Sequence, residues 1–163
     1  MIIDNKTAPH EKLMQTAKQF IEHKVPMMSY AGVEIIEVDN EHCVIKIPFK
    51  KETQNHLNSM YFGALAIGAD GAGGLIALYQ IMQTGKEISL VFKEFTAKFL
   101  RRPEADVYFT CREGLAVNKL IKQTIDTGKR VNMPVKIIAT TPSVSGDEPV
   151  AEFLLTLSLK YMR

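Results

Sequence analysis

Hydrophobic positions along the chain recur with two periods, one typical of helices and one typical of strands. In residues 7–24 and 115–127 apolar side chains recur every three or four positions, which predicts two amphipathic helices. Pro9 lies near the start of the first helix and Gly128 follows the second, and both residues are typical of those positions. The apolar residues that share one face are Leu13, Met14, Ala17, Phe20 and Ile21 in the first helix and Val117, Leu120, Ile121 and Ile125 in the second.

Six further stretches are apolar runs or alternate between apolar and polar residues, which predicts β-strands. The residues Asp39-Asn40-Glu41 separate the first two stretches and predict a hairpin, and Pro48 predicts that the second strand ends there or lies at a sheet edge. Because the later strands alternate strictly, we expect an antiparallel sheet with one face towards water. The six predicted strands cover residues 33–38, 43–49, 88–100, 105–112, 131–140 and 151–161.

Between the second and third strands lies an apolar segment, Tyr61–Met82, which contains one charged residue, Asp70. Its length alone fits a transmembrane helix. An aspartate near the middle of a membrane span costs about 2.5–3.5 kcal/mol, however, and the segment also holds five glycines. We therefore expect a helix buried inside a soluble fold, where the glycines allow strands to approach the helix backbone.

Together these elements predict a single α+β domain over residues 1–163. The order is a helix, two strands, the long apolar helix and four strands, with a short helix inserted among the last four. We expect the antiparallel sheet to wrap around the apolar helix, because both elements must bury their apolar surfaces. Residues 1–27 form an N-terminal helical extension in this prediction, and residues 30–162 form the core.

Composition and charge exclude several classes of function. The chain carries 20 Lys and Arg against 18 Asp and Glu, and a formal net charge of +2 gives no footprint for nucleic acid. Two cysteines, Cys43 and Cys111, lie far apart in the sequence, and with four scattered histidines they form no zinc or disulfide motif. The first residues lack a signal-peptide pattern, so we expect a cytoplasmic protein. No residue pattern implies a metal or redox cofactor.

The stretch that leads into the apolar helix carries the clearest chemical pattern. Asn55 precedes Tyr61-Phe62-Gly63 by six residues, and Asp70 follows Tyr61 by nine. This spacing resembles the active-site stretch of the hotdog-fold thioesterase superfamily, in particular its phenylacetic-acid-type branch and the related DUF4442 and YiiD-like proteins. In that branch an Asn, a His-Gly-Gly and an Asp have these spacings; here Tyr61 replaces the His and Phe62 the first Gly. Residues 99–107 also resemble a strand, Arg-Pro turn and strand of the family, and the whole resemblance covers residues 30–162.

The resemblance implies a hotdog fold and an enzyme that hydrolyses an acyl-coenzyme A thioester to free acid and coenzyme A. It also implies a homodimer or a dimer of dimers in which Asn55 and Asp70 of one site come from different subunits. Asp70 would act as base or nucleophile with a pKa raised by its apolar surroundings, Asn55 would orient water or thioester, and N–H groups near Gly63 would stabilise the oxyanion. The expected substrate-binding residues are Asn58, Ser59, Met60, Tyr61 and Phe62. Coenzyme A enters as part of the substrate, and we expect no nucleic-acid partner and no integral membrane segment.

Each of these residues also has an ordinary structural explanation. Asp70 would then hydrogen-bond a neighbouring strand, Asn55 and Ser59 would be loop and cap residues, and Arg101-Arg102 would face water instead of coenzyme A phosphates. Two other functions also stay open. The missing family His favours a non-catalytic acyl- or lipid-binding protein, and a hotdog dehydratase or hydratase ranks lower because its chemistry usually requires that His.

Overall fold

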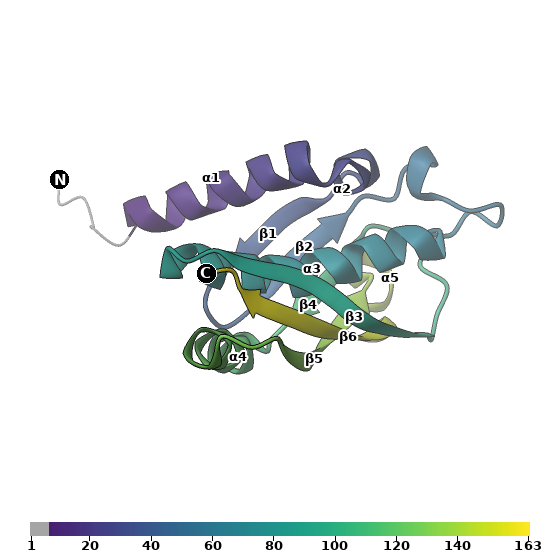
Figure 1. The fold of residues 1–163 in the computed structure, drawn as a ribbon. Helices are drawn as coiled ribbons and strands as arrows, with labels where there is room; N and C mark the ends of the chain where they lie inside the picture. Colours follow the sequence, from purple (N-terminus) through teal and green to yellow (C-terminus); the bar gives the residue numbers. More distant parts are fainter. Residues whose placement is uncertain (1–6) are drawn as a thin grey trace.

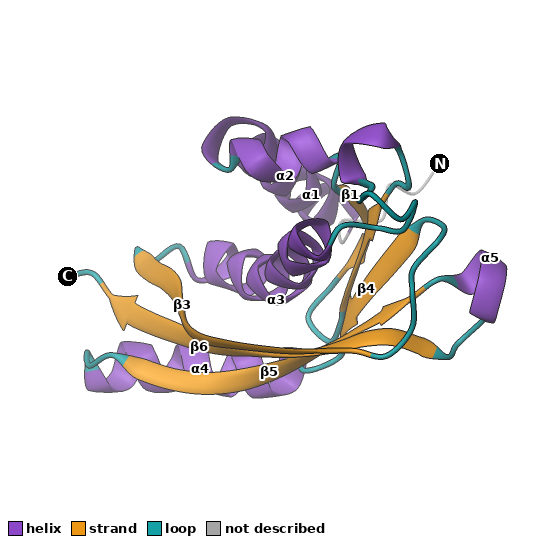
Figure 2. Ribbon diagram, turned by 90° about the vertical axis from the view of Figure 1, so that its right-hand side faces the viewer, coloured by secondary structure: helices purple, strands orange, loops and turns teal. Residues whose placement is uncertain are grey.

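The long apolar segment forms the central helix of the fold, α3 (Phe62–Thr84). In the computed structural model, which describes residues 7–163, a curved antiparallel sheet wraps around this helix (Figure 1, Figure 2). The helices α1 (Thr7–Lys24) and α2 (Pro26–Ala31) lie over the outer side of α3, and α4 (Gly114–Thr127) packs on the opposite face of the sheet. The α+β class and the sheet wrapped around an apolar helix are therefore confirmed.

The six strands lie in the order β1-β2-β4-β5-β6-β3, and each neighbouring pair is antiparallel. The strands β1 and β3 thus form the two edges of the sheet. As predicted, α4 is inserted between β4 and β5, and β2 ends directly before Pro48. The strand bounds are β1 (Glu34–Val38), β2 (Cys43–Ile47), β3 (Ile88–Phe99), β4 (Val107–Cys111), β5 (Val131–Thr140) and β6 (Pro149–Tyr161).

Two glycines of α3 allow the strands to pack directly on the helix backbone. A Cβ on Gly68 would collide with the ring of Phe109 on β4, and a Cβ on Gly71 would lie 2.5 Å from Cδ1 of Ile45 on β2. Both large side chains are fully buried against the helix. The prediction that glycines bring strands close to the helix is confirmed at these positions, where the close contact offsets the lower helix propensity of glycine.

The burial of α3 also explains its composition. This helix is long and apolar enough to cross a membrane, but 61% of its most apolar 18-residue window is buried inside the fold. The sheet, α1 and α2 supply the apolar surroundings that a lipid bilayer would otherwise supply. The prediction of a helix buried within the protein is confirmed.

Two short helices were not predicted. Pro26, two residues after the end of α1, begins α2, where a backbone N–H would have no partner within the helix, and Gly32 ends α2 with a φ of 77°. The second is α5 (Pro142–Ser145), which lies in the connection between β5 and β6. A three-residue 3-10 helix, Lys51–Thr53, follows β2.

The two cysteines are direct neighbours in space, although they lie far apart in the sequence. Cys43 on β2 and Cys111 on β4 are register partners across the sheet, and both are free thiols without exposed surface. Burial raises the pKa of Cys43, and it raises the pKa of Cys111 to about 11. Both thiols therefore stay protonated at neutral pH and behave as small core residues.

Candidate active site

The loop between β2 and α3 and the connection between β3 and β4 enclose a surface cavity of about 510 Å³, which we call the loop cavity. Five of the eight predicted site residues line it. Asn58, Gly63 and Asp70 do not. The lining residues are Asn55, His56, Leu57, Ser59, Met60, Tyr61, Phe62, Leu65, Phe99, Leu100, Arg101, Arg102 and Pro103.

Asn55 holds the loop in place with one half of its side chain. Its Oδ1 accepts hydrogen bonds from the backbone N–H groups of Leu57 (2.9 Å) and Ser59 (3.1 Å). Its own backbone N–H donates to the carbonyl of Ser59 at 2.8 Å. The loop explanation therefore accounts for the carbonyl oxygen of the amide, and the NH₂ group is the part that can donate a hydrogen bond to a ligand in the loop cavity.

Ser59 and Met60 form the buried floor of the loop cavity. Each side chain is 2% exposed, and the backbone N–H of Met60 donates to the carbonyl of Pro103 at 2.7 Å, which joins the two walls. Within residues 7–163 the hydroxyl oxygen of Ser59 has no hydrogen-bond partner. A buried polar group without a partner is costly, so this hydroxyl is suited to bind a polar atom inside the cavity.

Helix α3 begins at the loop cavity with unused backbone donors. The first helical bond runs from the N–H of Leu65 to the carbonyl of Tyr61 (3.1 Å), and no side chain caps the end. The N–H groups of Phe62, Gly63 and Ala64 precede this bond and lie at the positive end of the helix dipole. A Cβ on Gly63 would collide with the ring of Tyr61, so a larger residue at this position requires that half-exposed ring to move.

Asn58 lies outside the cavity lining. It is exposed and has a φ of 56°, the left-handed region that asparagine tolerates better than most residues. Its place in the structure is thus a turn position within the loop, and the expected contact with substrate has no geometric support in one chain.

Asp70 is a largely buried carboxylate one-third of the way along α3. Within the described part of the chain it makes neither a hydrogen bond nor an ion pair, and burial alone raises its pKa. The alternative of a buried carboxylate bonded to a neighbouring strand is therefore not observed. A carboxylate with a raised pKa and no partner is typical of a group that acts on a ligand.

Two apolar cavities meet at Asp70. The inner cavity, of about 210 Å³, extends towards α1 and α2, and the edge cavity, of about 330 Å³, opens along β3. Both are lined by Asp70 and Phe92. The inner cavity is otherwise lined by Phe20, Val25, Met28, Gly74, Leu75, Leu78, Leu90 and Val91, and the edge cavity by Ala66, Ile67, Phe95 and Leu155.

Within one chain Asp70 and the loop cavity are separate. Nine residues of helix between Tyr61 and Asp70 correspond to about 13.5 Å along the axis. Neither cavity at Asp70 is lined by Asn55, Tyr61 or Phe62. The structure therefore brings together the residues at the start of α3, but not these residues with the Asp70 of the same chain.

Arginine residues lie at the mouth of the loop cavity. Arg101 pairs with Glu148 on the β5–β6 connection, and Arg102 lies 3.9 Å from Glu104. All four side chains are more than half exposed, so these pairs contribute little stability. Both guanidinium groups can therefore exchange these partners for an anionic ligand.

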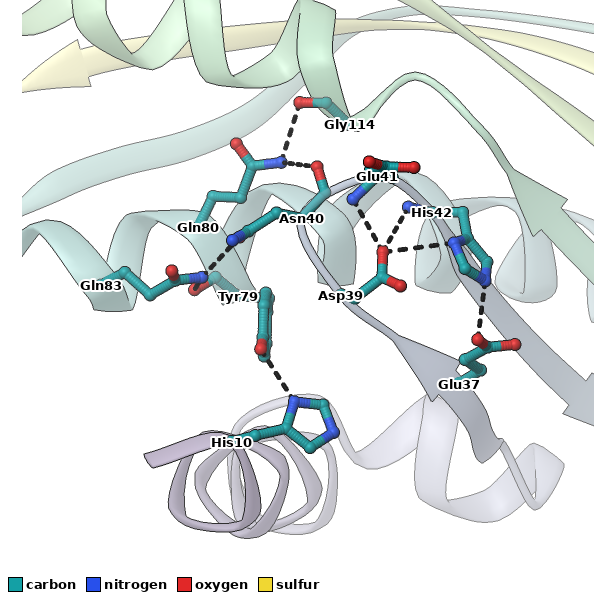
Figure 3. Close-up of polar contacts among 10 residues, drawn as sticks. All are labelled: His10, Glu37, Asp39, Asn40, Glu41, His42, Tyr79, Gln80, Gln83 and Gly114. Atoms are coloured by element: carbon teal, nitrogen blue, oxygen red, sulfur yellow. Dashed lines mark hydrogen bonds and ion pairs between the residues drawn. The ribbon is translucent and has the colours of Figure 1, made fainter. Parts of the chain in front are cut away.

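The opposite end of α3 carries a polar network that joins three parts of the fold (Figure 3). Tyr79 Oη lies 2.8 Å from Nδ1 of His10 on α1, and the Gln80 amide donates to the carbonyls of Asn40 and Gly114. The network therefore fixes α1 and the β1–β2 hairpin to the central helix. The residues of this network are distant from one another in sequence, so the pattern of hydrophobic positions along the chain did not predict their contacts.

One histidine lies among carboxylates in this region. His42 Nε2 is 2.9 Å from Glu37 and its Nδ1 is 3.2 Å from Oδ1 of Asp39, and the ligand atoms of all three residues lie within 4.8 Å of one another. Asp39 Oδ1 also accepts the backbone N–H groups of Glu41 and His42. In the described part of the chain, the contacts among these residues hold the β1–β2 hairpin closed (Figure 3).

Comparison with known families assigns the chain. The profile of a domain of unknown function, DUF4442, matches residues 14–153. The chain belongs to the DUF4442 family. No curated protein matches the sequence.

Solved structures share the fold of this DUF4442 protein at low sequence identity. A Chlorobaculum tepidum protein of unknown function has a TM-score of 0.82 and 15% identity over 93% of this chain and 96% of its own. A Pseudomonas aeruginosa protein of unknown function, named a probable thioesterase, has a TM-score of 0.76 and 21% identity over 91% and 96%. A thioesterase family protein from Silicibacter pomeroyi has a TM-score of 0.68 and 16% identity over 92% and 99%. The predicted hotdog fold is thus confirmed.

Several residues near Asp70 in this DUF4442 protein were not predicted from the sequence to belong to the site. Phe92 and Phe95 on β3 line the cavities at the carboxylate, and Phe20 and Met28 reach the inner cavity from the N-terminal helices. The alternation of β3 marked Phe95 as a residue of the apolar face. Only the packing of α1 and α2 on α3 shows that part of this apolar surface surrounds Asp70.

Proposed function

We propose that the protein is a cytoplasmic enzyme that hydrolyses an acyl-coenzyme A thioester, with Asp70 as the general base. The observation that carries this proposal is the unpaired carboxylate of Asp70 at the meeting point of two apolar cavities. Its raised pKa makes it a stronger base than a surface aspartate. The names of similar structures, among them a thioesterase family protein, support the same class of reaction.

The reaction needs water as its only co-substrate. Asp70 removes a proton from a water molecule while the water oxygen attacks the thioester carbonyl carbon. The tetrahedral oxyanion then collapses, the carbon–sulfur bond breaks, and the proton passes from Asp70 to the sulfur of coenzyme A. The products are the free acid and coenzyme A, and this sequence of steps requires neither a metal ion nor a redox cofactor.

Donors for the oxyanion are present at the start of α3. The N–H groups of Phe62, Gly63 and Ala64 belong to the first turn of α3, and Asn55 and Phe62 line the loop cavity. Preorganised donors of this kind are worth about 10²–10³ in rate. Because the helix-start donors lie about 9–12 Å along the helix axis from the Asp70 of their own chain, the proposed site uses the loop cavity of a second subunit.

The edge strand β3 offers a surface for that second subunit. It is 12 residues long, and Val91, Phe95 and Phe99 on it are 49%, 46% and 54% exposed. A long edge strand with exposed apolar side chains is a template for pairing with another chain. We infer that β3 pairs antiparallel with β3 of a second copy, as a homodimer or within a dimer of dimers.

Two phenylalanines of β3 lie beside the two halves of the site. The ring centroid of Phe99, at the C-terminal end of β3, lies 6.3 Å from that of Phe62 at the loop cavity, whereas Phe92, near the middle of the strand, lines both cavities at Asp70. Antiparallel pairing centred between these two residues, near Phe95, reverses their order in the partner. The loop cavity of one subunit would therefore face Asp70 of the partner subunit.

Thiol release from a panel of acyl-coenzyme A substrates tests the reaction. We expect Asp70→Asn to lower kcat by about 10²–10⁴-fold. The matched control Asp126→Asn, an exposed aspartate on α4, should retain the wild-type rate.

The wild-type rate should rise with pH through a pKa above the ordinary aspartate range, because the base acts in its ionised form. Turnover by Asp70→Asn at the wild-type rate would refute the mechanism, and tight acyl binding without wild-type turnover would favour the acyl-binding alternative.

Mixing two inactive variants tests the shared site. In a mixed dimer of Asn55→Ala and Asp70→Asn chains, one site carries both substitutions and the other carries neither, provided that the two residues act across the interface. Random exchange of subunits should then restore about a quarter of the wild-type activity, because half of the dimers are mixed and each has one intact site. If both residues act within one chain, no mixture regains activity.

A further inference from the structure

The inner cavity beside Asp70 has a nearly uniform apolar lining. Its walls come from three directions: Phe20, Val25 and Met28 from the N-terminal helices, Leu75 and Leu78 from α3, and Leu90, Val91 and Phe92 from β3. Among the described residues that line it, Asp70 alone is ionisable. A cavity of this kind suits a hydrocarbon chain with a single polar group at one end.

The cavity runs along one face of α3 and begins at the carboxylate. Asp70, Gly74 and Leu78 are spaced by four residues, so they lie in one line that is about 12 Å long. Gly74 leaves the passage beside Asp70 open: a Cβ there would lie 3.6 Å from Asp70 Oδ1 and 3.8 Å from the ring of Phe92. Leu78 is the lining residue of α3 that lies farthest along the helix from Asp70.

The outer wall of the cavity is firmly attached to the core. Met28 on α2 is 6% exposed, and Ala17 and Ile21 on α1 are buried against the rest of the fold. The contact between His10 and Tyr79 fixes the N-terminal half of α1 to the far end of α3 (Figure 3). Among the residues from the N-terminal helices, Phe20 at 40% exposure lies at the rim.

We propose that the inner cavity holds the acyl chain of the substrate and that α1 and α2 limit its length. This inference rests on the proposed hydrolysis at Asp70, because it places the thioester carbonyl at the mouth of the cavity beside that carboxylate. The volume of about 210 Å³ holds roughly seven methylene groups, if each takes a volume similar to that of a water molecule. The substrate class is an unbranched acyl-coenzyme A of medium chain length.

The substitution Leu78→Phe tests the length limit, since it fills the far end of the cavity. Each methylene that the cavity buries contributes roughly fourfold in kcat/KM. We expect the ratio of kcat/KM for octanoyl- over butanoyl-coenzyme A to fall by about tenfold or more in Leu78→Phe. The control Met82→Phe, one turn further along α3 and outside the cavity lining, should leave this ratio unchanged. An unchanged ratio in Leu78→Phe would overturn the inference and leave the proposed hydrolysis intact.

Binding of straight-chain primary alcohols tests the cavity without turnover. The hydroxyl can donate to Asp70 while the chain enters the cavity, so affinity should rise roughly fourfold per methylene and level off near octan-1-ol. In Leu78→Phe the affinity should level off at a shorter chain. Affinity that does not depend on chain length would overturn the inference. Absence of wild-type turnover together with length-dependent alcohol binding would refute the hydrolysis and retain the cavity as an acyl-chain site.

Discussion

At the scale of single residues, the free energy of unfolding depends on the protonation of one buried carboxyl group, that of Asp70. Because burial raises the pKa of Asp70, the folded state holds its proton at pH values where the unfolded chain has lost it. The free energy of unfolding should therefore fall as pH rises from the ordinary aspartate range through this raised pKa. At pH values above this raised pKa the ionised Asp70 destabilises the fold.

The substitution Asp70→Asn removes that charge and should stabilise the protein at pH values above the raised pKa of Asp70. Each kcal/mol gained raises Tm by about 2–4 °C in a chain of this size. Thermal unfolding of both proteins between pH 4 and 8, followed by circular dichroism, should show a difference in Tm that grows with pH. A difference that does not change with pH would show that Asp70 has an ordinary pKa in the fold.

The candidate residues were predicted unequally well. The resemblance carried by the spacing of Asn55, Tyr61 and Asp70 singles out both ends of the proposed site, because short motifs keep their register along the chain. The sequence did not show that the amide oxygen of Asn55 accepts hydrogen bonds within the loop while its NH₂ group stays available. The side chains around Asp70 come from α1, α2 and β3, and no local pattern shows which distant residues meet at one point.

At the scale of elements, α3 tolerates or rejects a methyl group according to what packs on it. Gly68→Ala places a Cβ against the ring of Phe109, and overpacking of a core costs about 1–3 kcal/mol. Gly74→Ala meets only ordinary contacts and gains the higher helix propensity of alanine, about 1 kcal/mol. Urea unfolding should therefore show that Gly68→Ala is less stable and Gly74→Ala at least as stable as the wild type. Equal effects at the two positions would contradict the packing described for α3.

Elements with a strong periodic pattern were predicted closely. The bounds of α1 are those predicted, and the last two strands follow the predicted alternation. The pattern failed at α2, where a proline that ends one helix also begins the next, and six residues are too few to show a helical repeat. The sequence also did not predict that β2 lies beside β4 with Cys43 opposite Cys111, because strand order depends on contacts that are distant in sequence.

At the scale of the whole molecule, assembly should depend on the exposed edge of the sheet. Phe95→Glu would place two carboxylates near each other at a β3–β3 junction, so we expect a monomer in light scattering with little activity. The matched control is Leu154→Glu, because Leu154 is 47% exposed, close to the 46% of Phe95, but lies on the inner strand β6. A dimer that survives Phe95→Glu and dissociates in Leu154→Glu would place the interface on the sheet face.

The edge position of β3 also has a consequence for how the rate varies with protein concentration. If each site needs a carboxylate from one copy and helix-start donors from another, a lone chain has no complete site. Under conditions where most chains are monomeric, the total rate should grow with the square of the protein concentration, because two chains must meet before either can act. The unpaired strand would then make abundance itself a control on activity, with no additional regulatory domain.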